Sequence, residues 1–179
     1  MRVSTPYEGQ MFPGWDWSSA IAAPLSLHSC IVKEEWTDYN DHMSESTYLL
    51  VFGDSSDAFF RYFGIDERYR ADGLSIYTVE THIRNLLEAS IDDTLTCTIQ
   101  VLGVDQKRLH IAHEMYRTRD DKLIATAEQM LLHVDIESGR TAEFPTEIQQ
   151  RLDAIAESHS GLNRPDWVGR SITMPVKGK

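Results

Sequence analysis

The stretch of residues 48–63 constrains the fold more than any other, because its aromatic side chains recur with the period of a helix. Spacings of four and seven residues place these side chains on one side of an α-helix. Ser44 is expected to cap this helix and Gly64 to end it. A face that broad must be covered by other elements, since it would otherwise leave several aromatic rings in water. The aromatic residues concerned are Tyr48, Phe52, Phe59 and Phe63.

After this helix the hydrophobic period changes to two, which indicates β-strands. A weaker strand signal precedes the helix, and a second amphipathic helix follows the last strand. Short links between the later strands favour antiparallel hairpins, so we expect those four strands to form a meander. The expected strands cover residues 28–36, 74–84, 95–101, 109–116 and 123–135, and the second helix covers residues 145–160.

A single long helix among five strands fits only if the sheet wraps around it. We therefore predict an α+β hot-dog fold, with a long central helix wrapped by an antiparallel five-stranded sheet and with a C-terminal helix. The length of 179 residues suits one domain. Residues 1–24 are expected to form an N-terminal arm, residues 25–144 the hot-dog domain, and residues 145–179 a helix and tail packed on that domain.

The charge and the cysteine content limit the functions that this chain can have. It has 28 acidic against 17 basic residues and a net charge of −11, so we expect no nucleic-acid partner and no anionic membrane surface. No stretch approaches the roughly 20 apolar residues of a membrane span, and Glu8, Pro13 and Asp16 interrupt the apolar run that a signal peptide needs. Cys30 and Cys97 are too few for a disulfide framework. We expect a soluble, cytoplasmic protein.

The densest group of polar residues lies between the first strand and the long helix. Asp38, Asn40, Asp41 and His42 together offer acid, amide and imidazole groups that can orient a water molecule. The N-terminus of the helix adds N–H groups that polarise a carbonyl oxygen. We expect this acidic turn to point into a pocket. The alternative is an ordinary helix-capping loop, because Asp, Asn and Ser favour such turns.

A resemblance to known enzymes favours the catalytic interpretation. Residues 38–44, followed by Tyr48, are similar to the Asp-x-Asn-x-His-Val-Asn…Tyr signature of acyl thioesterases with the hot-dog fold. Over residues 25–144 the chain resembles the 4-hydroxybenzoyl-CoA thioesterase superfamily. Within it, the chain resembles the betainyl-CoA thioesterases of carnitine degradation. This last likeness is carried by residues 35–43, 79–83, 102–110 and 130–135.

The resemblance implies roles for particular residues. Asp38, Asn40 and His42 match the motif residues that act on the thioester and its water, and Glu88 lies near the position of a further catalytic carboxylate. Some bacterial members have a catalytic carboxylate where this chain has Asn40, so a nucleophile there is excluded. Either Asp38 or Asp41 is then the base, and direct attack by water fits better than an acyl-enzyme. The resemblance also implies a homodimer or homotetramer with the site at a subunit interface.

Basic residues are candidates for binding the phosphates of coenzyme A. Lys107 and Arg108 lie in an expected hairpin, and Arg84 is a further candidate. The alternative is a solvated hairpin with no ligand.

A betaine group would need its trimethylammonium enclosed by aromatic faces with an acid nearby. Five residues around the expected site offer these groups, although aromatic residues on strands and central helices belong more often to the core. The candidates are Trp36, Tyr39, Tyr48, Tyr77 and Glu80.

Other chemistries fit this sequence poorly. Residues 113–117 lack the second histidine of a zinc-protease motif, and residues 53–57 lack the second glycine of a nucleophile elbow. We expect no metal and no cofactor, with an acyl-CoA as the substrate. Two alternatives stay open, namely an enzyme acting on an acyl carrier protein and a non-catalytic acyl-binding subunit. An acidic carrier would want a basic surface, which counts against the first.

Overall fold

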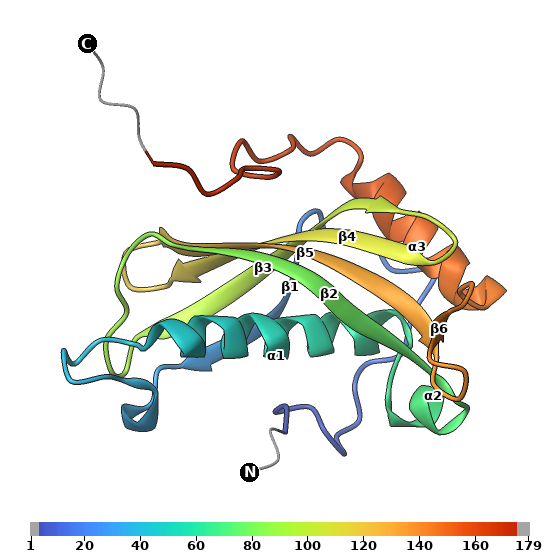
Figure 1. Ribbon diagram of the computed structural model, residues 1–179, viewed down its shortest axis with the longest axis horizontal. Coiled ribbons are helices and arrows are strands. Elements are labelled where there is room, and N and C mark those ends of the chain that lie inside the picture. Colours follow the sequence, from blue (N-terminus) through green and yellow to red (C-terminus); the bar gives the residue numbers. More distant parts are fainter. Residues whose placement is uncertain (1–3, 175–179) are drawn as a thin grey trace.

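A computed structural model describes residues 4–174 and contains a curved sheet with a long helix in its concave side (Figure 1). No helix in that range is long and apolar enough to cross a membrane. The elements are β1 (Leu25–Ile31), a 3-10 turn (Glu34–Trp36), α1 (Glu45–Phe63), α2 (Glu67–Ala71), β2 (Leu74–Asn85), β3 (Thr94–Val104), β4 (Arg108–Arg117), β5 (Lys122–Asp135), β6 (Arg140–Thr141) and α3 (Thr146–His159).

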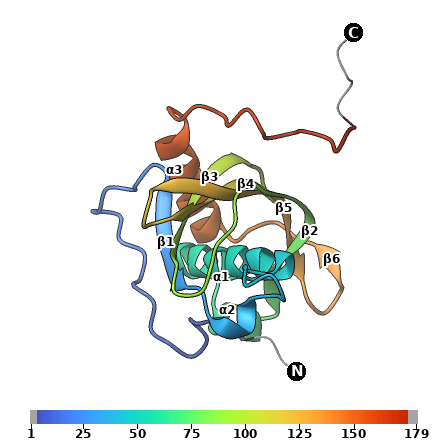
Figure 2. The ribbon, with the colours of Figure 1, turned by 90° about the vertical axis from the view of Figure 1, so that its left-hand side faces the viewer.

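The strands form one antiparallel sheet in the order β1-β3-β4-β5-β2, and the short β6 pairs with β5. Seen from the end, the sheet curls around α1 (Figure 2). A long helix wrapped by five antiparallel strands, with a C-terminal helix added, confirms the predicted hot-dog fold.

The core lies between α1 and the concave face of the sheet. Phe52, Phe59 and Phe63 are fully buried, as the helical period predicted. α1 begins after Ser44 and ends at Gly64, whose φ of 109° is left-handed. Burying a large apolar side chain stabilises the fold by about 1.5–3 kcal/mol. This apolar face therefore fixes α1 inside the sheet.

The predicted meander of four strands is wrong in one respect. β3, β4 and β5 follow one another as hairpins, but β2 pairs with β5 and not with β3. Residues 86–93 therefore cross from β2, at one edge of the sheet, to β3, which lies next to the other edge strand β1, and we call them the crossover. Its first backbone N–H groups, from Leu86 and Leu87, both donate to the carbonyl of Ile124, so the chain leaves β2 without turning back.

The first strand is shorter than predicted and begins earlier. After Ile31 the chain departs from the sheet because Val32 exchanges backbone hydrogen bonds with the crossover, donating to Asp93 O at 2.9 Å and accepting from Asp92 N at 3.0 Å. The 3-10 turn then replaces the end of the predicted strand. α2 was not predicted either. It is a five-residue helix whose N-cap is the side chain of Asp66.

Both ends of the described chain pack on the outside of the domain. In the N-terminal part the hydroxyl of Tyr7 lies 2.7 Å from His28 Nδ1. The segment after α3 crosses the sheet face that points away from α1 (Figure 1) and buries Trp167. The division into arm, domain and tail stays a prediction, and residues 1–3 and 175–179 of the predicted arm and tail lie outside the described residues.

Candidate active site

The polar loop before α1 forms a tight turn held by its own backbone. Asp38 N–H donates to His42 O at 2.9 Å, and Asp41 N–H donates to Asp38 O at 3.0 Å. The carboxylate of Asp38 accepts the Asn40 N–H at 2.8 Å. Asp41 adopts a left-handed φ of 60°, which Asp and Asn tolerate better than most residues. The spacing of these residues therefore serves the turn as well as any chemistry.

This loop is fixed to the N-terminal end of α1. The carbonyl of Trp36 accepts the Ser44 N–H at 2.8 Å and the Thr47 hydroxyl at 3.4 Å. The side chain of Ser44 makes no capping hydrogen bond. The positive end of the α1 dipole thus lies beside the loop, where it favours negative charge on a bound group.

The crossover runs alongside the same loop. Met43 N–H donates to Ala89 O at 2.8 Å, and His42 forms a β-bridge with Ser90. As a result His42 Nε2 lies 3.3 Å from Glu88 Oε2. The structure therefore brings together the histidine and the carboxylate that the resemblance implied, although they are far apart in the sequence.

The acidic side of the loop faces solvent in the single chain. Asp38, Tyr39, Asn40 and Asp41 are exposed, and Tyr39 is 95% exposed. None of them lines the pocket of about 490 Å³ on the opposite face of the sheet. The expected pocket around this turn is therefore not built by the single chain, and His42, with 39% of its side chain exposed, is the most enclosed of the loop's candidate catalytic groups.

The candidate aromatic residues occupy different environments. Trp36 is half-buried, and the ammonium of Lys33 lies 5.2 Å from the centre of its ring. Tyr77 lies on β2 and is 50% exposed. Tyr48 is 3% exposed, and burial raises the pKa of its phenol. Its ring belongs to the core, so within one chain it offers no open face to a ligand.

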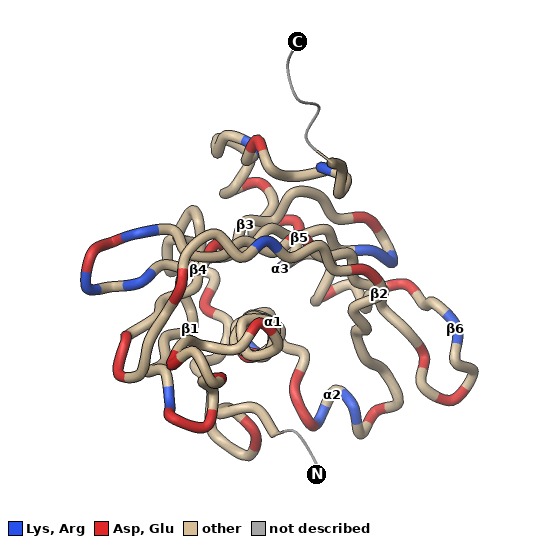
Figure 3. The backbone as a smooth tube through the Cα atoms, turned by 60° about the vertical axis from the view of Figure 1, so that its left-hand side comes forward, with Lys and Arg blue, Asp and Glu red and all other residues tan. Residues whose placement is uncertain are grey.

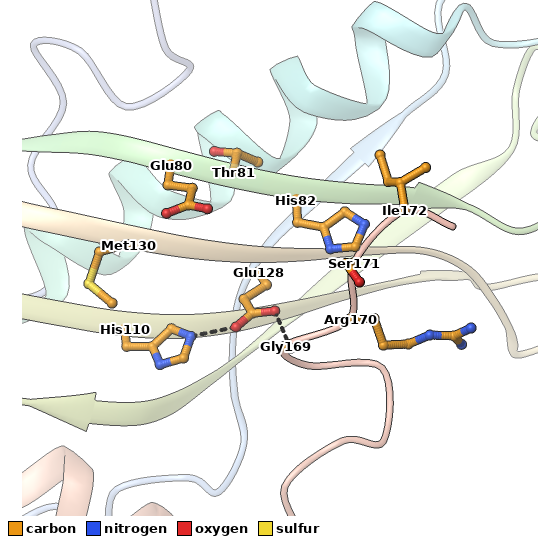
Figure 4. A pocket seen from close by; sticks show the side chains of 10 residues that line it. All are labelled: Glu80, Thr81, His82, His110, Glu128, Met130, Gly169, Arg170, Ser171 and Ile172. Carbon is orange, nitrogen blue, oxygen red and sulfur yellow. Dashed lines mark hydrogen bonds and ion pairs between the residues drawn. The ribbon is translucent and has the colours of Figure 1, made fainter. Parts of the chain in front are cut away.

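Glu80 lies apart from the loop, in a pocket of about 490 Å³ on the sheet face away from α1. The pocket is formed by β2, β4 and β5 together with residues 169–172 (Figure 4). Glu128 holds the covering segment there, because it accepts the Gly169 N–H at 2.6 Å and pairs with His110 at 2.8 Å. Within one chain Glu80 is therefore not grouped with His42 and Glu88.

The three candidate residues for coenzyme A are not brought together in one chain. Lys107 and Arg108 lie in the β3–β4 turn, at the opposite end of the sheet from the crossover. The guanidinium of Arg108 pairs with Asp105 at 2.6 Å, which partly neutralises it. Arg84 lies near the end of β2. Among the described residues, basic positions lie close to acidic ones along the outer loops of the backbone (Figure 3).

One residue that contacts the backbone beside this site was not among the candidates from the sequence. Arg117, at the end of β4, donates from Nη1 to the carbonyl of Glu88 at 2.5 Å. Nothing local in the sequence indicates this contact, because it depends on where the crossover passes. Within residues 4–174, no three His, Cys, Asp or Glu side chains are grouped to hold a metal ion.

Two of the curated proteins similar to this chain have thioesterase names. A betainyl-CoA thioesterase from Pseudomonas aeruginosa is 40% identical over 152 residues, which cover 84% of this chain and 96% of that protein. An L-carnitine dehydrogenase/betainyl-CoA thioesterase from Rhizobium sp is 46% identical over 149 residues, which cover 83% of this chain and 30% of that protein. The chain thus spans less than a third of such two-activity relatives.

Solved structures show the same fold. A putative thioesterase from Pseudomonas putida is 35% identical, with a TM-score of 0.76 over 87% of this chain and 99% of that chain. A hypothetical protein from Staphylococcus aureus, solved in complex with CoA, is 24% identical, with a TM-score of 0.79 over 88% of this chain and all of that one. The family model described as the Thioesterase-like superfamily matches residues 32–152. This chain therefore belongs to the thioesterase-like superfamily.

Proposed function

We propose that this protein hydrolyses the thioester of a short acyl-CoA, with betainyl-CoA as the substrate and with betaine and coenzyme A as the products, in carnitine breakdown. The observation that carries the proposal is the contact of His42 Nε2 with Glu88 Oε2 at 3.3 Å, beside the N-terminal end of α1. The name of the Pseudomonas aeruginosa relative, 96% of which is matched, supports the choice of acyl group.

In the proposed reaction His42 removes a proton from water as the water oxygen attacks the thioester carbonyl carbon. Glu88 orients the imidazole and balances the charge that it gains. We assign the Asn40 amide and the first N–H groups of α1 to the oxygen that becomes negative. The C–S bond then breaks, and the coenzyme A thiolate takes the proton from His42. Water is the only co-reactant, so we propose that no cofactor takes part.

Asp38 and Asp41 are the competing candidates for the base. Asp38 already accepts the Asn40 N–H, and Asp41 occupies the left-handed position of the turn. We therefore assign both mainly to the shape of the loop. Because their side chains are exposed on the loop that carries His42, they also add negative charge that attracts a cationic acyl group.

The cationic acyl group has a matching surface beside the loop. The ammonium of Lys33 lies over the ring of Trp36, 5.2 Å from its centre, so this ring face is suited to a cation. Tyr39 offers a second aromatic face. We propose that the trimethylammonium lies against these rings, with Tyr77 and Glu80 supplied by a neighbouring subunit.

We also propose that the protein works as a homodimer or homotetramer in the cytoplasm. Within the described residues β2 has a strand partner on one side only, and Tyr77 and Val79 are exposed along it. An open edge of that length invites pairing with another strand. A second chain would also cover the exposed acidic turn and bring Arg84, Lys107 and Arg108 of one chain closer to the turn of the other. The two cysteines are free, which fits a reducing compartment.

A thiol-release assay tests this function. Betainyl-CoA is compared with 3,3-dimethylbutyryl-CoA, a neutral substrate of the same shape in which carbon replaces the quaternary nitrogen. We expect kcat/KM to be about 100-fold higher for betainyl-CoA, the ratio given by roughly 2–3 kcal/mol of cation–aromatic and charge attraction. His42→Ala should lower kcat by about 100-fold or more, whereas Asp38→Asn and Asp41→Asn should each cost less than about tenfold.

The same panel separates the alternatives. If an aspartate variant loses as much activity as His42→Ala, that aspartate is the base. If both substrates react equally well, the cationic preference is wrong while the hydrolase remains. Thiol release from an acyl carrier protein alone would point to a carrier-dependent enzyme, and saturable binding with no thiol release to an acyl-binding subunit.

A further inference from the structure

The backbone around Glu88 is held by two side chains that lie outside the polar loop. From β4, Arg117 Nη1 donates to Glu88 O at 2.5 Å. From α1, the Tyr48 hydroxyl donates to Leu87 O at 3.2 Å and accepts the Ala89 N–H at 3.2 Å. Three consecutive residues of the crossover are thus gripped through their backbone by two different elements.

We infer that Arg117 and Tyr48 are positioning residues that hold the crossover so that the Glu88 carboxylate meets His42. We call these two residues the clamp. The inference rests on the proposed function, because it assigns the clamp a role in thioester hydrolysis through Glu88. Neither clamp residue touches the substrate in this account.

The pair that the clamp serves is too exposed to hold its own geometry. The side chain of Glu88 is 72% exposed and that of His42 is 39% exposed. Ion pairs between exposed groups contribute only about 0–1 kcal/mol, and ordering the long side chain opposes them. The 3.3 Å approach therefore depends on where the backbone of each residue is fixed.

Arg117 is suited to this task because its guanidinium is itself fixed. Its Nε and Nη2 donate to the two carboxylate oxygens of Asp120 at 2.9 and 2.7 Å, and only 12% of its side chain is exposed. That bidentate pair uses Nε and Nη2 within the β4–β5 turn. The remaining nitrogen, Nη1, donates to the backbone carbonyl of Glu88, the residue whose side chain contacts His42.

Tyr48 ties the crossover to the helix that carries the loop. It lies in the first turns of α1 and is 3% exposed, so its hydroxyl has little freedom. That hydroxyl satisfies one acceptor and one donor of the crossover at once. Hydrogen bonds therefore join the start of α1, the loop and the crossover to one another.

A double-mutant cycle tests the clamp. Arg117→Gln and Glu88→Gln are made singly and together, and hydrolysis of betainyl-CoA is measured with the full chain. We expect Arg117→Gln to lower kcat about 10- to 100-fold, the order expected from a misplaced catalytic group, with KM changed less than about twofold. In the Glu88→Gln background the same change should have almost no further effect, because the clamp acts through Glu88.

Tyr48→Phe gives a second, smaller variant, and we expect the same loss of kcat and the same dependence on Glu88. Lys122→Gln is the matched control, since Lys122 lies at the same turn, 3.7 Å from Asp120, and is not bonded to the crossover. It should keep wild-type kcat. Thermal unfolding of every variant shows whether it is folded. If Arg117→Gln is unfolded, the comparison of Tyr48→Phe with the wild type tests the inference instead.

The outcomes distinguish the clamp from the function itself. If Arg117→Gln or Tyr48→Phe lowers kcat as much in the Glu88→Gln background as in the wild type, the inference is overturned and the clamp has only a structural role. A Glu88→Gln variant with wild-type activity would overturn the inference as well. In both cases hydrolysis of the acyl-CoA stands, although a fully active Glu88→Gln variant would also remove the role that the proposed reaction gives to Glu88. If the wild-type chain releases no thiol from any acyl-CoA, the proposed function fails instead, and the clamp with it.

Discussion

His113 is the histidine whose surroundings differ most from water. It is fully buried between the sheet and α1, and its Nε2 lies 3.2 Å from both Ser56 Oγ and Gln129 Oε1. Its Nδ1 has no hydrogen-bond partner. Burial lowers the pKa of this imidazole to about 4, because the charged form cannot be solvated there.

Acid should therefore weaken the fold through His113. Its pKa is about 4 in the folded protein and about 6.5 when unfolded, so the unfolded chain takes up the proton first as pH falls. The stability that it contributes is complete above pH 6.5 and is lost between pH 6.5 and 4, by about 2–3 kcal/mol. Urea unfolding of the wild type and His113→Gln at pH 7 and pH 4.5 measures this. An equal loss in both proteins would contradict the prediction.

At this scale the sequence indicated two of the residues that the structure brings together and could not indicate others. His42 was found because it lies in a short local motif, and Glu88 was found only through family resemblance. Arg117 had no signal, because its role depends on a contact between residues far apart in the chain. The environment of Tyr48 was also beyond reach, since an aromatic residue on a helix fits both a core and a binding face.

At the scale of single elements, the end of α1 is set by Gly64. Its φ of 109° is unfavourable for other residues, and an added Cβ would lie 2.5 Å from Arg151 Nη1 and 3.2 Å from Ile148 Cδ1 of α3. The helix thus stops where an added side chain would require Arg151 and Ile148 of α3 to shift.

Two alanine substitutions should have opposite effects on stability. Gly64→Ala should lower the free energy of unfolding by about 1–3 kcal/mol, through backbone strain and the close approach of Arg151. Gly53→Ala, in the exposed middle of α1 with nothing within 4 Å, should raise it by about 0.5–1 kcal/mol. Urea unfolding of both variants checks this. Equal effects would show that the conformation at Gly64 is not strained for alanine.

The elements were predicted well wherever a hydrophobic period was long. α1, β2, β3, β4, β5 and α3 follow the expected residues within a few positions. The first strand was predicted to end too late, because polar and apolar residues keep alternating over residues 32–36 after the backbone has turned towards the crossover. Strand order escaped prediction for another reason. A local period shows that residues 74–84 form a strand, but it does not say which strand becomes its partner.

At the scale of the whole molecule, the open edge of β2 is the surface through which we propose that chains combine. Val79 has no register partner on β5, and it is 54% exposed. If two chains pair along β2, these positions lie at the shared boundary, where the acidic turns are also covered. Subunit assembly and activity then depend on the same strand.

Placing a charge on this edge should separate the chains. We expect Val79→Lys to convert an oligomer into a monomer, because two like charges would be buried face to face, and to lower kcat/KM together with the assembly. Sedimentation velocity and thiol release on the same samples measure both. Leu49→Lys, at an exposed position on α1, is the matched control. A wild type that sediments as an active monomer would refute the shared site.

The crossover has a consequence for how the chain tolerates change in length. Although it is neither helix nor strand, its backbone is bound to β5, to α1, to β4 and to the polar loop in turn. Because hydrogen bonds fix the backbone along the whole crossover, an inserted or deleted residue would shift every later contact by one position. Variation in length, whether by evolution or by engineering, should therefore spare residues 86–93.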